Sequence, residues 1–140
     1  MMIPAELIAF VAGFPVMLAH LAIALGAFVL AGAVYSLTSR AADIAQVRQG
    51  NAAASVLYGA TLLALALPIA RALSSSSGYI DIALWSLAAG LAQLALFGVC
   101  DLLLAGLTAR IRDDADMAAS ALLGAARLAT ALLLSAAISV

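Results

Sequence analysis

Two charged side chains stand inside long apolar stretches of this sequence, Asp101 and Arg127. A charge near the centre of a membrane-spanning helix costs about 2.5 to 3.5 kcal/mol on insertion scales, so such a residue is usually paired or functional. The two side chains could form an ion pair that fixes how two helices pack, or they could line a path for an ion. Of these two interpretations, we favour the structural ion pair.

The expected depths of these two residues allow them to meet. Counting from the cytoplasmic ends of their helices at about 1.5 Å per residue puts Asp101 roughly 10 Å deep and Arg127 roughly 16 Å deep. Side chains lean toward the N-terminus of their own helix, so the two tips lean toward each other. We therefore predict an ion pair between the third and fourth helices, within one chain or across a subunit boundary. Reversing both charges should then restore what a single reversal destroys.

Two uncharged polar side chains, His20 and Gln93, are expected at similar depth in the outer half of the first and third helices. They could form a hydrogen bond across the bundle, which is worth about 0.6 kcal/mol on average in membrane proteins. A single histidine is weak evidence for a metal site, although His20 could also handle protons. We predict no metal, no cofactor and no enzyme, because the polar residues contain no set of nucleophile, base and orienting group.

The composition indicates that hydrocarbon surrounds most of the chain. Of the 140 residues, 67% are hydrophobic and 9% are charged, and the mean hydropathy is +1.22. A typical soluble domain has about 25% charged residues. The net charge of -1 gives no basic excess of the kind that indicates nucleic acid binding. The single Cys100 allows no disulfide within the chain, and we expect it to be a small packing residue.

Four apolar stretches are long enough to cross about 30 Å of hydrocarbon, and backbone groups in lipid must be satisfied locally, as in helices. We therefore predict an all-α polytopic membrane protein, a single transmembrane domain over residues 1–140. Pro15 and Pro68 are expected to bend their helices, and Pro4 to Phe14 could lie in the interface. The predicted spans are Ile8 to Leu37, Ala52 to Leu73, Ile80 to Leu107 and Met117 to Val140.

The connections predict the orientation. The first, Thr38 to Asn51, and the third, Thr108 to Asp116, are charged, whereas Ser74 to Gly78 is a flexible loop. Ile44 and Val47 are spaced to face one side of a short interfacial helix that Gly50 ends. The first and third connections hold four arginines, Arg40, Arg48, Arg110 and Arg112, whereas the other face has Arg71 alone. Because basic loops stay in the cytoplasm, both termini are predicted to be periplasmic.

The sequence contains an internal repeat. The string from Ala53 to Ala60 recurs from Ala118 to Ala125, and each copy follows a residue that can cap a helix N-terminus, Asn51 or Asp116. Two tandem hairpins, about residues 8–73 and 80–140, would thus be parallel pseudo-repeats related by an axis along the membrane normal. The alternative is that two alanine-rich helices resemble each other by chance.

The chain resembles the YjfL-type family of small bacterial inner-membrane proteins, domain of unknown function family 350. The resemblance covers nearly the whole chain and is strongest from Arg48 to Ser55, with further matches from Gly59 to Pro68, at Ile80-Asp81, Trp85 and Ala92-Gln93-Leu94, and from Ala118 to Gly124. It implies a paired-hairpin membrane protein without an established activity, sometimes set in envelope-stress or polyamine-related gene contexts. Relatives tend to have a basic residue at the position of Asp101 and a small one at that of Arg127, so this chain departs from them at both positions.

We interpret the chain as a non-enzymatic protein of the bacterial inner membrane that acts through helix packing. Its partners would be the lipid bilayer and either further copies of itself, as a homo-oligomer, or another membrane protein, and no nucleic acid. The alternative is a small transporter or channel in which Asp101, Arg127, His20 and Gln93 line a polar path. Such a path needs polar residues on one helical face at several depths, and this sequence supplies few.

The predicted orientation can be tested by labelling single cysteines placed at Ser76 or at Arg112 in a Cys100→Ala background. Because Ser76 belongs to the outer loop, we expect only Ser76→Cys to react with a membrane-impermeant thiol reagent on intact cells. Reaction of Arg112→Cys under the same conditions would contradict the orientation.

Overall fold

The computed structural model describes residues 4–39 and 44–138, and within these residues the regular structure is α-helical. Four of the helices are long and apolar enough to span a membrane, so the chain is an all-α membrane protein. Arg40 and Asp43 of the first predicted connection and Val140 at the end of the fourth predicted span lie outside the described residues. In order, the helices are α1 (Ala5–Thr38), α2 (Ile44–Arg48), α3 (Ala52–Ser75), α4 (Tyr79–Leu103), α5 (Leu107–Asp114) and α6 (Met117–Ala137).

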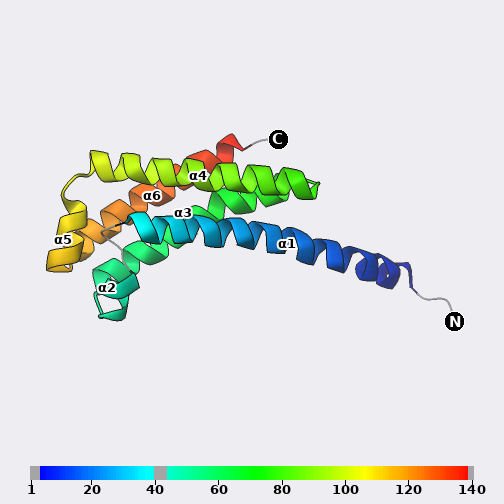
Figure 1. Ribbon diagram of the computed structural model, residues 1–140, viewed down its shortest axis with the longest axis horizontal. Helices are drawn as coiled ribbons and strands as arrows, with labels where there is room; N and C mark the ends of the chain where they lie inside the picture. The colour runs from blue at the N-terminus through cyan, green and yellow to red at the C-terminus, as the bar shows by residue number, and fades with distance from the viewer. Residues whose placement is uncertain (1–3, 40–43, 139–140) are drawn as a thin grey trace.

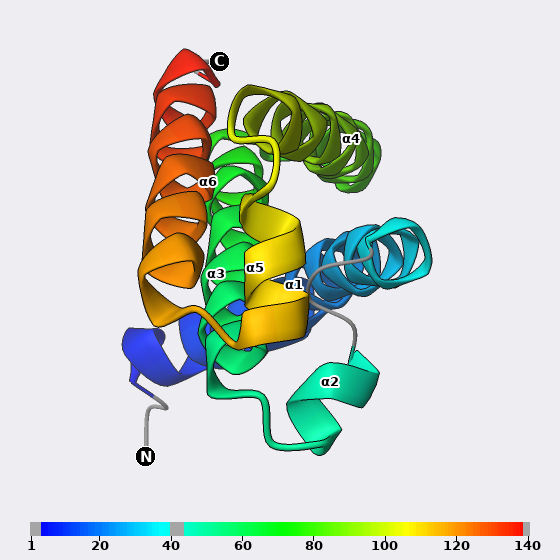
Figure 2. The same cartoon turned by 90° about the vertical axis from the view of Figure 1, so that its left-hand side faces the viewer.

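The four long helices run back and forth as two successive hairpins (Figure 1). The short helices α2 and α5 lie together at one end, while the start of α1, the end of α6 and the α3–α4 loop lie toward the other. Seen from the α2 and α5 end, α3 lies between α6 on one side and α1 and α4 on the other (Figure 2). The most extensive helix contact joins α3 to α6, the two return helices.

The third predicted span was wrong at its C-terminal end. The apolar run continues to Leu107, but α4 ends at Leu103 and α5 begins at Leu107. Between them Gly106 has a φ of 92°, in the left-handed region that glycine adopts without the steric cost of a Cβ. Hydropathy cannot detect this turn, because its other residues are leucine and alanine. As a result Asp101 lies only two residues, or about 3 Å, from the end of its helix, so the expected distance of roughly 10 Å from that end was wrong.

The predicted short helix after the first span is confirmed as α2, and Gly50 ends it with a φ of 87°. The two internal prolines do not interrupt their helices. Helix α1 continues through Pro15, and α3 continues through Pro68. A proline removes one backbone hydrogen bond, which a long helix tolerates where the neighbouring turns remain intact.

Small residues set the distances between the helices. The residues of α1 buried against the rest of the bundle include Ala24, Ala27 and Ala31. A Cβ added at Gly90 would lie 3.3 Å from the Cβ of Ala31, and one added at Gly124 would lie 3.0 Å from the Cβ of Ala60. Association of membrane helices relies on close packing, because lipid is as apolar as the side chains it replaces. The α3–α6 contact therefore depends on the absence of a side chain at position 124.

Helix α1 is longer than the others and leaves the bundle at its N-terminal end (Figure 1). It has 34 residues, whereas α6 has 21, which corresponds to lengths of about 51 Å and 32 Å. From Pro4 to Leu18 every residue is exposed. Nearly half of α1 is thus a largely apolar helix whose side chains are exposed.

Replacing Gly124 by leucine should destabilise the protein, because the new side chain has to separate α3 from α6. Overpacking of this kind costs about 1 to 3 kcal/mol. Gly59 is a matched control, since it occupies the corresponding position in the first hairpin and a Cβ there meets nothing within 4 Å. Thermal unfolding in mild detergent should show a lower midpoint for Gly124→Leu than for Gly59→Leu, and equal midpoints would contradict the packing.

Candidate functional site

The guanidinium of Arg127 forms hydrogen bonds with one residue from each of the other three long helices. Its Nη1 donates to the hydroxyl of Tyr35 at 2.7 Å and to Oγ1 of Thr61 at 2.8 Å. Its Nη2 donates to Oδ1 of Asp101 at 2.7 Å. Because Arg127 belongs to α6 while Tyr35, Thr61 and Asp101 belong to α1, α3 and α4, one side chain connects all four. Arg127 itself is completely buried, with 0% of its surface exposed.

Two aromatic rings enclose the same guanidinium. Its central carbon lies 5.2 Å from the ring centre of Tyr35 and 4.9 Å from that of Phe97. The two rings meet edge to face at 5.8 Å. A cation against aromatic faces gains about 2 kcal/mol or more when it is desolvated. The rings therefore replace part of the hydration that Arg127 loses on burial.

Asp101 marks the accessible side of this cluster. Its side chain is 38% exposed, whereas that of Arg127 is not exposed. The carboxylate lies at the wall of a pocket of about 200 Å³ between α1 and α4, which Tyr35 and Phe97 also line. Three residues that contact Arg127 thus form part of this pocket, and the pair is buried on the arginine side only.

Gln93 contacts the backbone of Arg127 and the next turn of α6. Its Nε2 donates to Oγ1 of Thr130 at 3.1 Å and to the backbone oxygen of Arg127 at 3.4 Å. Gln93 is completely buried. It therefore connects α4 to α6 about two turns before Asp101 along α4, and it strengthens the same helix contact.

His20 does not meet Gln93, so the expected hydrogen bond between them was wrong. The imidazole packs edge to face against Tyr79 at 5.1 Å between ring centres. Gln93 lies fourteen residues further along α4, or about 21 Å away. The depth estimate failed because α1 begins well outside the bundle, so that His20 is level with the start of α4. Among the described residues, no group of three metal-ligating side chains could hold an ion.

The two N-cap residues hold the starts of the return helices. Oδ1 of Asn51 accepts from the backbone N–H of Ala54 at 3.0 Å, and Oδ1 of Asp116 accepts from Ala118 at 2.9 Å and from Ala119 at 3.0 Å. Each satisfies backbone donors that the helix leaves free.

Residues at the N-terminal ends of α3 and α6 also form hydrogen bonds with another helix. Nδ2 of Asn51 donates to the backbone oxygen of Ile111 in α5 at 3.0 Å. The hydroxyl of Ser120 in α6 donates to the backbone oxygen of Ala53 in α3 at 2.6 Å. The two hairpins are therefore joined by hydrogen bonds at this end of the bundle.

The pKa of Asp116 is lowered, mainly by the hydrogen bond from the backbone N–H of Ala119 and also by its contact with Arg110. A carboxyl whose pKa is lower in the folded state stabilises the fold above its unfolded pKa. That contribution disappears as the pH falls through the folded value. Arg112 likewise lowers the pKa of Asp113 through a side-chain hydrogen bond.

Three partners of Arg127 were not predicted from the sequence: Tyr35, Thr61 and Phe97. A signal was present for Thr61, which is the only hydroxyl-bearing residue between Tyr58 and Ser74 in an apolar helix. Tyr35 and Phe97 carry no such signal, since aromatic residues are common in membrane helices. Their role depends on which face of each helix meets α6, and that follows only from the packing.

Comparison with known proteins gives one match. A family model described as Domain of Unknown Function (DUF350) matches residues 9–138. Searches among curated proteins and among solved structures gave no match. The matched range contains Asp101, Arg127 and every partner of Arg127 named above.

The energetic coupling of Asp101 to Arg127 can be measured with a double-mutant cycle. Asp101→Asn should destabilise the protein by about 1.5 to 3 kcal/mol, the usual contribution of a hydrogen bond to a charged group, because Arg127 remains buried and charged. Arg127→Gln also loses Tyr35 and Thr61, so we expect about 3 to 5 kcal/mol. The double variant should be less destabilised than the sum, as measured by unfolding in mild detergent. Strict additivity would show that the two residues act independently.

Proposed function

The chain belongs to the DUF350 family, and we propose that it works as a non-enzymatic subunit of the bacterial inner membrane. It would act through helix packing, either as a homo-oligomer or as an accessory subunit beside another membrane protein. A setting in envelope stress is carried over from the resemblance alone. In this proposal both termini are periplasmic, and α2 and α5 face the cytoplasm.

The observation that carries the proposal is the way in which Arg127 is bound. Both terminal nitrogens of its guanidinium donate to side chains of other helices, at 2.7 to 2.8 Å. A charge that moved an ion or a proton would have to exchange these partners, and removing one partner from a buried pair costs about 3 to 5 kcal/mol. The intramembrane charge therefore favours a role in holding the bundle together.

The distribution of arginines supports the proposed orientation. Arg48 ends α2, and Arg110 and Arg112 lie in α5, at the same end of the bundle. Arg71 lies near the other end, where its Nε donates to the backbone oxygen of Ile138 at 3.1 Å. An excess of Lys and Arg in short connections is typical of the cytoplasmic side.

One observation favours the alternative of a small transporter or channel. The pocket of about 200 Å³ beside Asp101 lies next to its partly exposed carboxylate, at the end of the bundle that is cytoplasmic in the proposed orientation. A path would have to continue past Arg127 and Gln93, both of which are completely buried. The alternative therefore requires a second arrangement of the helices.

Flux measurements separate the two functions. Purified protein is reconstituted into liposomes that contain a pH-sensitive dye, and proton entry is followed after an acid jump, with and without a potassium gradient. We expect the same rate as in protein-free liposomes. Fast entry that Asp101→Asn abolishes, in protein that elutes normally on size exclusion, would overturn the packing function.

Mass measurement in mild detergent tests the oligomeric or accessory role directly. We expect either a defined multiple of the 14.0 kDa chain or one co-purifying membrane protein in fixed ratio. A monomer with no partner, extracted under several mild conditions, would contradict the proposal.

A further inference from the structure

A groove runs along the contact between α1 and α4. Its floor consists of small buried residues, since Ala27 and Ala31 of α1 are each 7% exposed and Gly90 of α4 is buried. Its rims carry large exposed side chains, among them Leu30 at 54% and Leu91 at 66%. This apolar part of the groove has a volume of about 110 Å³. Small residues on the floor and large residues on the rims leave a concave strip that an extended hydrocarbon chain can fill.

The apolar part adjoins the polar pocket beside Asp101. Leu94 lines both the apolar part and this pocket of about 200 Å³, and we call the two together the α1–α4 groove. On α4 its lining residues run from Leu87 to Asp101, fourteen residues or about 21 Å. One leaflet of a membrane contains about 15 Å of hydrocarbon. The groove is therefore long enough for an acyl chain, with a polar headgroup at the Asp101 end.

The polar end of the groove favours a cation. Oδ1 of Asp101 accepts from Arg127, whereas Oδ2 has no hydrogen-bond partner among the residues that the structure describes. Because Arg127 is completely buried behind the carboxylate, the exposed end of this ion pair is its negative end. The hydroxyl of Thr38, which also lines the pocket, donates to the backbone oxygens of Val34 and Tyr35, so its lone pairs remain for a ligand. The pocket thus offers acceptors to a ligand that carries N–H donors.

Two helix ends add negative potential at the same place. Helix α1 ends at Thr38 and α4 ends at Leu103, and both of these ends lie at the α2 and α5 end of the bundle (Figure 1). The C-terminus of a helix carries a partial negative charge that attracts cations. The two arginines of α5 are already paired with nearby carboxylates. A positively charged group therefore suits this pocket better than an anion does.

The depth of the pocket in the membrane corresponds to that of lipid headgroups. Helix α4 has 25 residues, which gives a length of about 38 Å. Centred on about 30 Å of hydrocarbon, it extends about 4 Å beyond the acyl chains at each end. Because Asp101 lies about 3 Å from the end of α4, its carboxylate is at the boundary between headgroups and chains. A cationic group at Asp101 and a hydrocarbon chain along the apolar part can thus belong to one molecule.

We propose that the α1–α4 groove binds a phospholipid whose headgroup carries a primary ammonium, with the ammonium at Asp101 and one acyl chain between α1 and α4. An ammonium has three N–H donors and no acceptor, which matches a pocket rich in acceptors. An anionic headgroup brings a phosphate without an ammonium, and the carboxylate repels it. This site goes beyond the proposed function and does not depend on it, because a monomer, an oligomer and an accessory subunit all present the groove to lipid.

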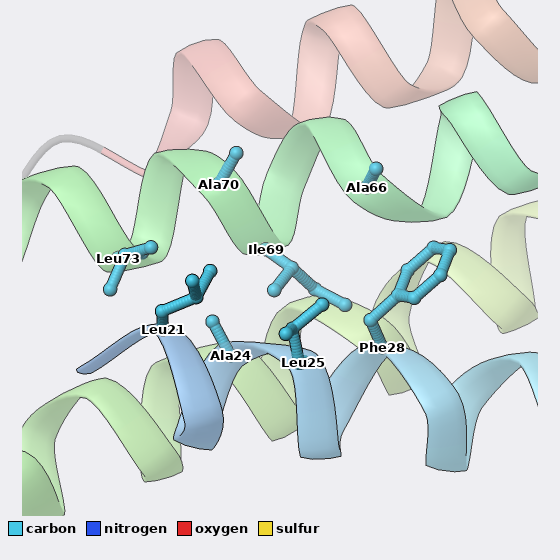
Figure 3. Close-up of a pocket in the computed structure, with 8 residues that line it drawn as sticks. All are labelled: Leu21, Ala24, Leu25, Phe28, Ala66, Ile69, Ala70 and Leu73. Carbon is cyan, nitrogen blue, oxygen red and sulfur yellow. The ribbon is translucent and has the colours of Figure 1, made fainter. Parts of the chain in front are cut away.

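The groove between α1 and α3 provides an internal comparison (Figure 3). Its volume is about 230 Å³, and the residues that line it, among them Leu25, Phe28 and Ile69, are all apolar. Lipid chains can occupy it, but it has no charged group with which to distinguish one headgroup from another. Selectivity between headgroups is therefore expected at the α1–α4 groove alone.

Native mass spectrometry of the full chain in mild detergent measures this selectivity. The protein is mixed with equal amounts of dioleoyl phosphatidylethanolamine and dioleoyl phosphatidylglycerol, which have the same chains. We expect several-fold more of the ethanolamine lipid in the bound fraction. Asp101→Asn removes the charge with little change of shape, so the ratio of the two bound lipids should fall to about one.

A second variant tests the place of binding while the Asp101–Arg127 pair stays intact. Gly98 lines the polar pocket, and a Cβ added there meets nothing within 4 Å, so Gly98→Leu fills the pocket without a clash. We expect it to lose the preference for the ethanolamine lipid. Gly26→Leu is the matched control, because a Cβ at Gly26 also meets nothing within 4 Å and Gly26 lines neither part of the groove. This control should bind as the unchanged protein does.

A chain-free headgroup separates a lipid from a soluble amine. Glycerophosphoethanolamine has the same headgroup without acyl chains, and an excess of it should leave the bound lipid in place. Displacement of the lipid by this compound would reject the role of the apolar part.

The remaining outcomes also decide the proposal. Equal binding of both lipids to the unchanged protein would reject it. A preference that persists in Asp101→Asn would reject the carboxylate as the recognising group, and one that persists in Gly98→Leu would reject the location. None of these results alters the mass expected for an oligomer or an accessory subunit, so the proposed function is judged separately.

Discussion

Burial of the Arg127 guanidinium is the constraint on which the rest of the bundle depends. Withdrawing a charge from water into a low-dielectric interior is costly unless its donors are all engaged in good geometry. Here α1 supplies a hydroxyl, α3 a second hydroxyl and α4 a carboxylate to the two terminal nitrogens, while Nε of Arg127 has no hydrogen-bond partner among the described residues. The three groups reach the guanidinium only when the helices have one particular set of depths and rotations. The hydrogen bonds of Arg127 therefore depend on the packing of all four long helices.

Much of this architecture follows from the sequence, because hydrocarbon permits few solutions. The four spans, apart from the end of the third, and the short helix before Asn51 follow from chain length and polarity. The pairing of Asp101 with Arg127 was predicted from the direction of side chains on a helix, although the depth assigned to Asp101 was wrong. Two features could not be predicted from the sequence, because they depend on backbone dihedral angles and on the displacement of one helix along another. Gly106 turns the chain inside an apolar run, and the overhang of α1 shifts His20 away from Gln93. Neither the turn nor the overhang changes the hydropathy of the sequence.

Each hairpin consists of two long helices with a short helix between them, but the two hairpins differ in the polar residues that their long helices contain. Counted from Asn51 and Asp116, Ser36 corresponds to Asp101 and Leu62 to Arg127. The first hairpin thus has a serine and a leucine where the second has its ion pair, and Ser36 instead hydrogen-bonds the backbone oxygen of Gly32 at 2.9 Å. If a duplication produced the two halves, the charges belong to only one of them. The second hairpin contains the charge, and the first supplies two of the groups that stabilise it.

This division has a consequence for biogenesis. When the second hairpin enters the bilayer, it brings Asp101 for Arg127 but neither of the hydroxyls that complete the shell. Until it docks, the arginine must retain water or reach toward the headgroups. Because the N-terminal hairpin is synthesised first, the hydroxyls of Tyr35 and Thr61 can already be in place when the second hairpin brings Arg127 to the bundle.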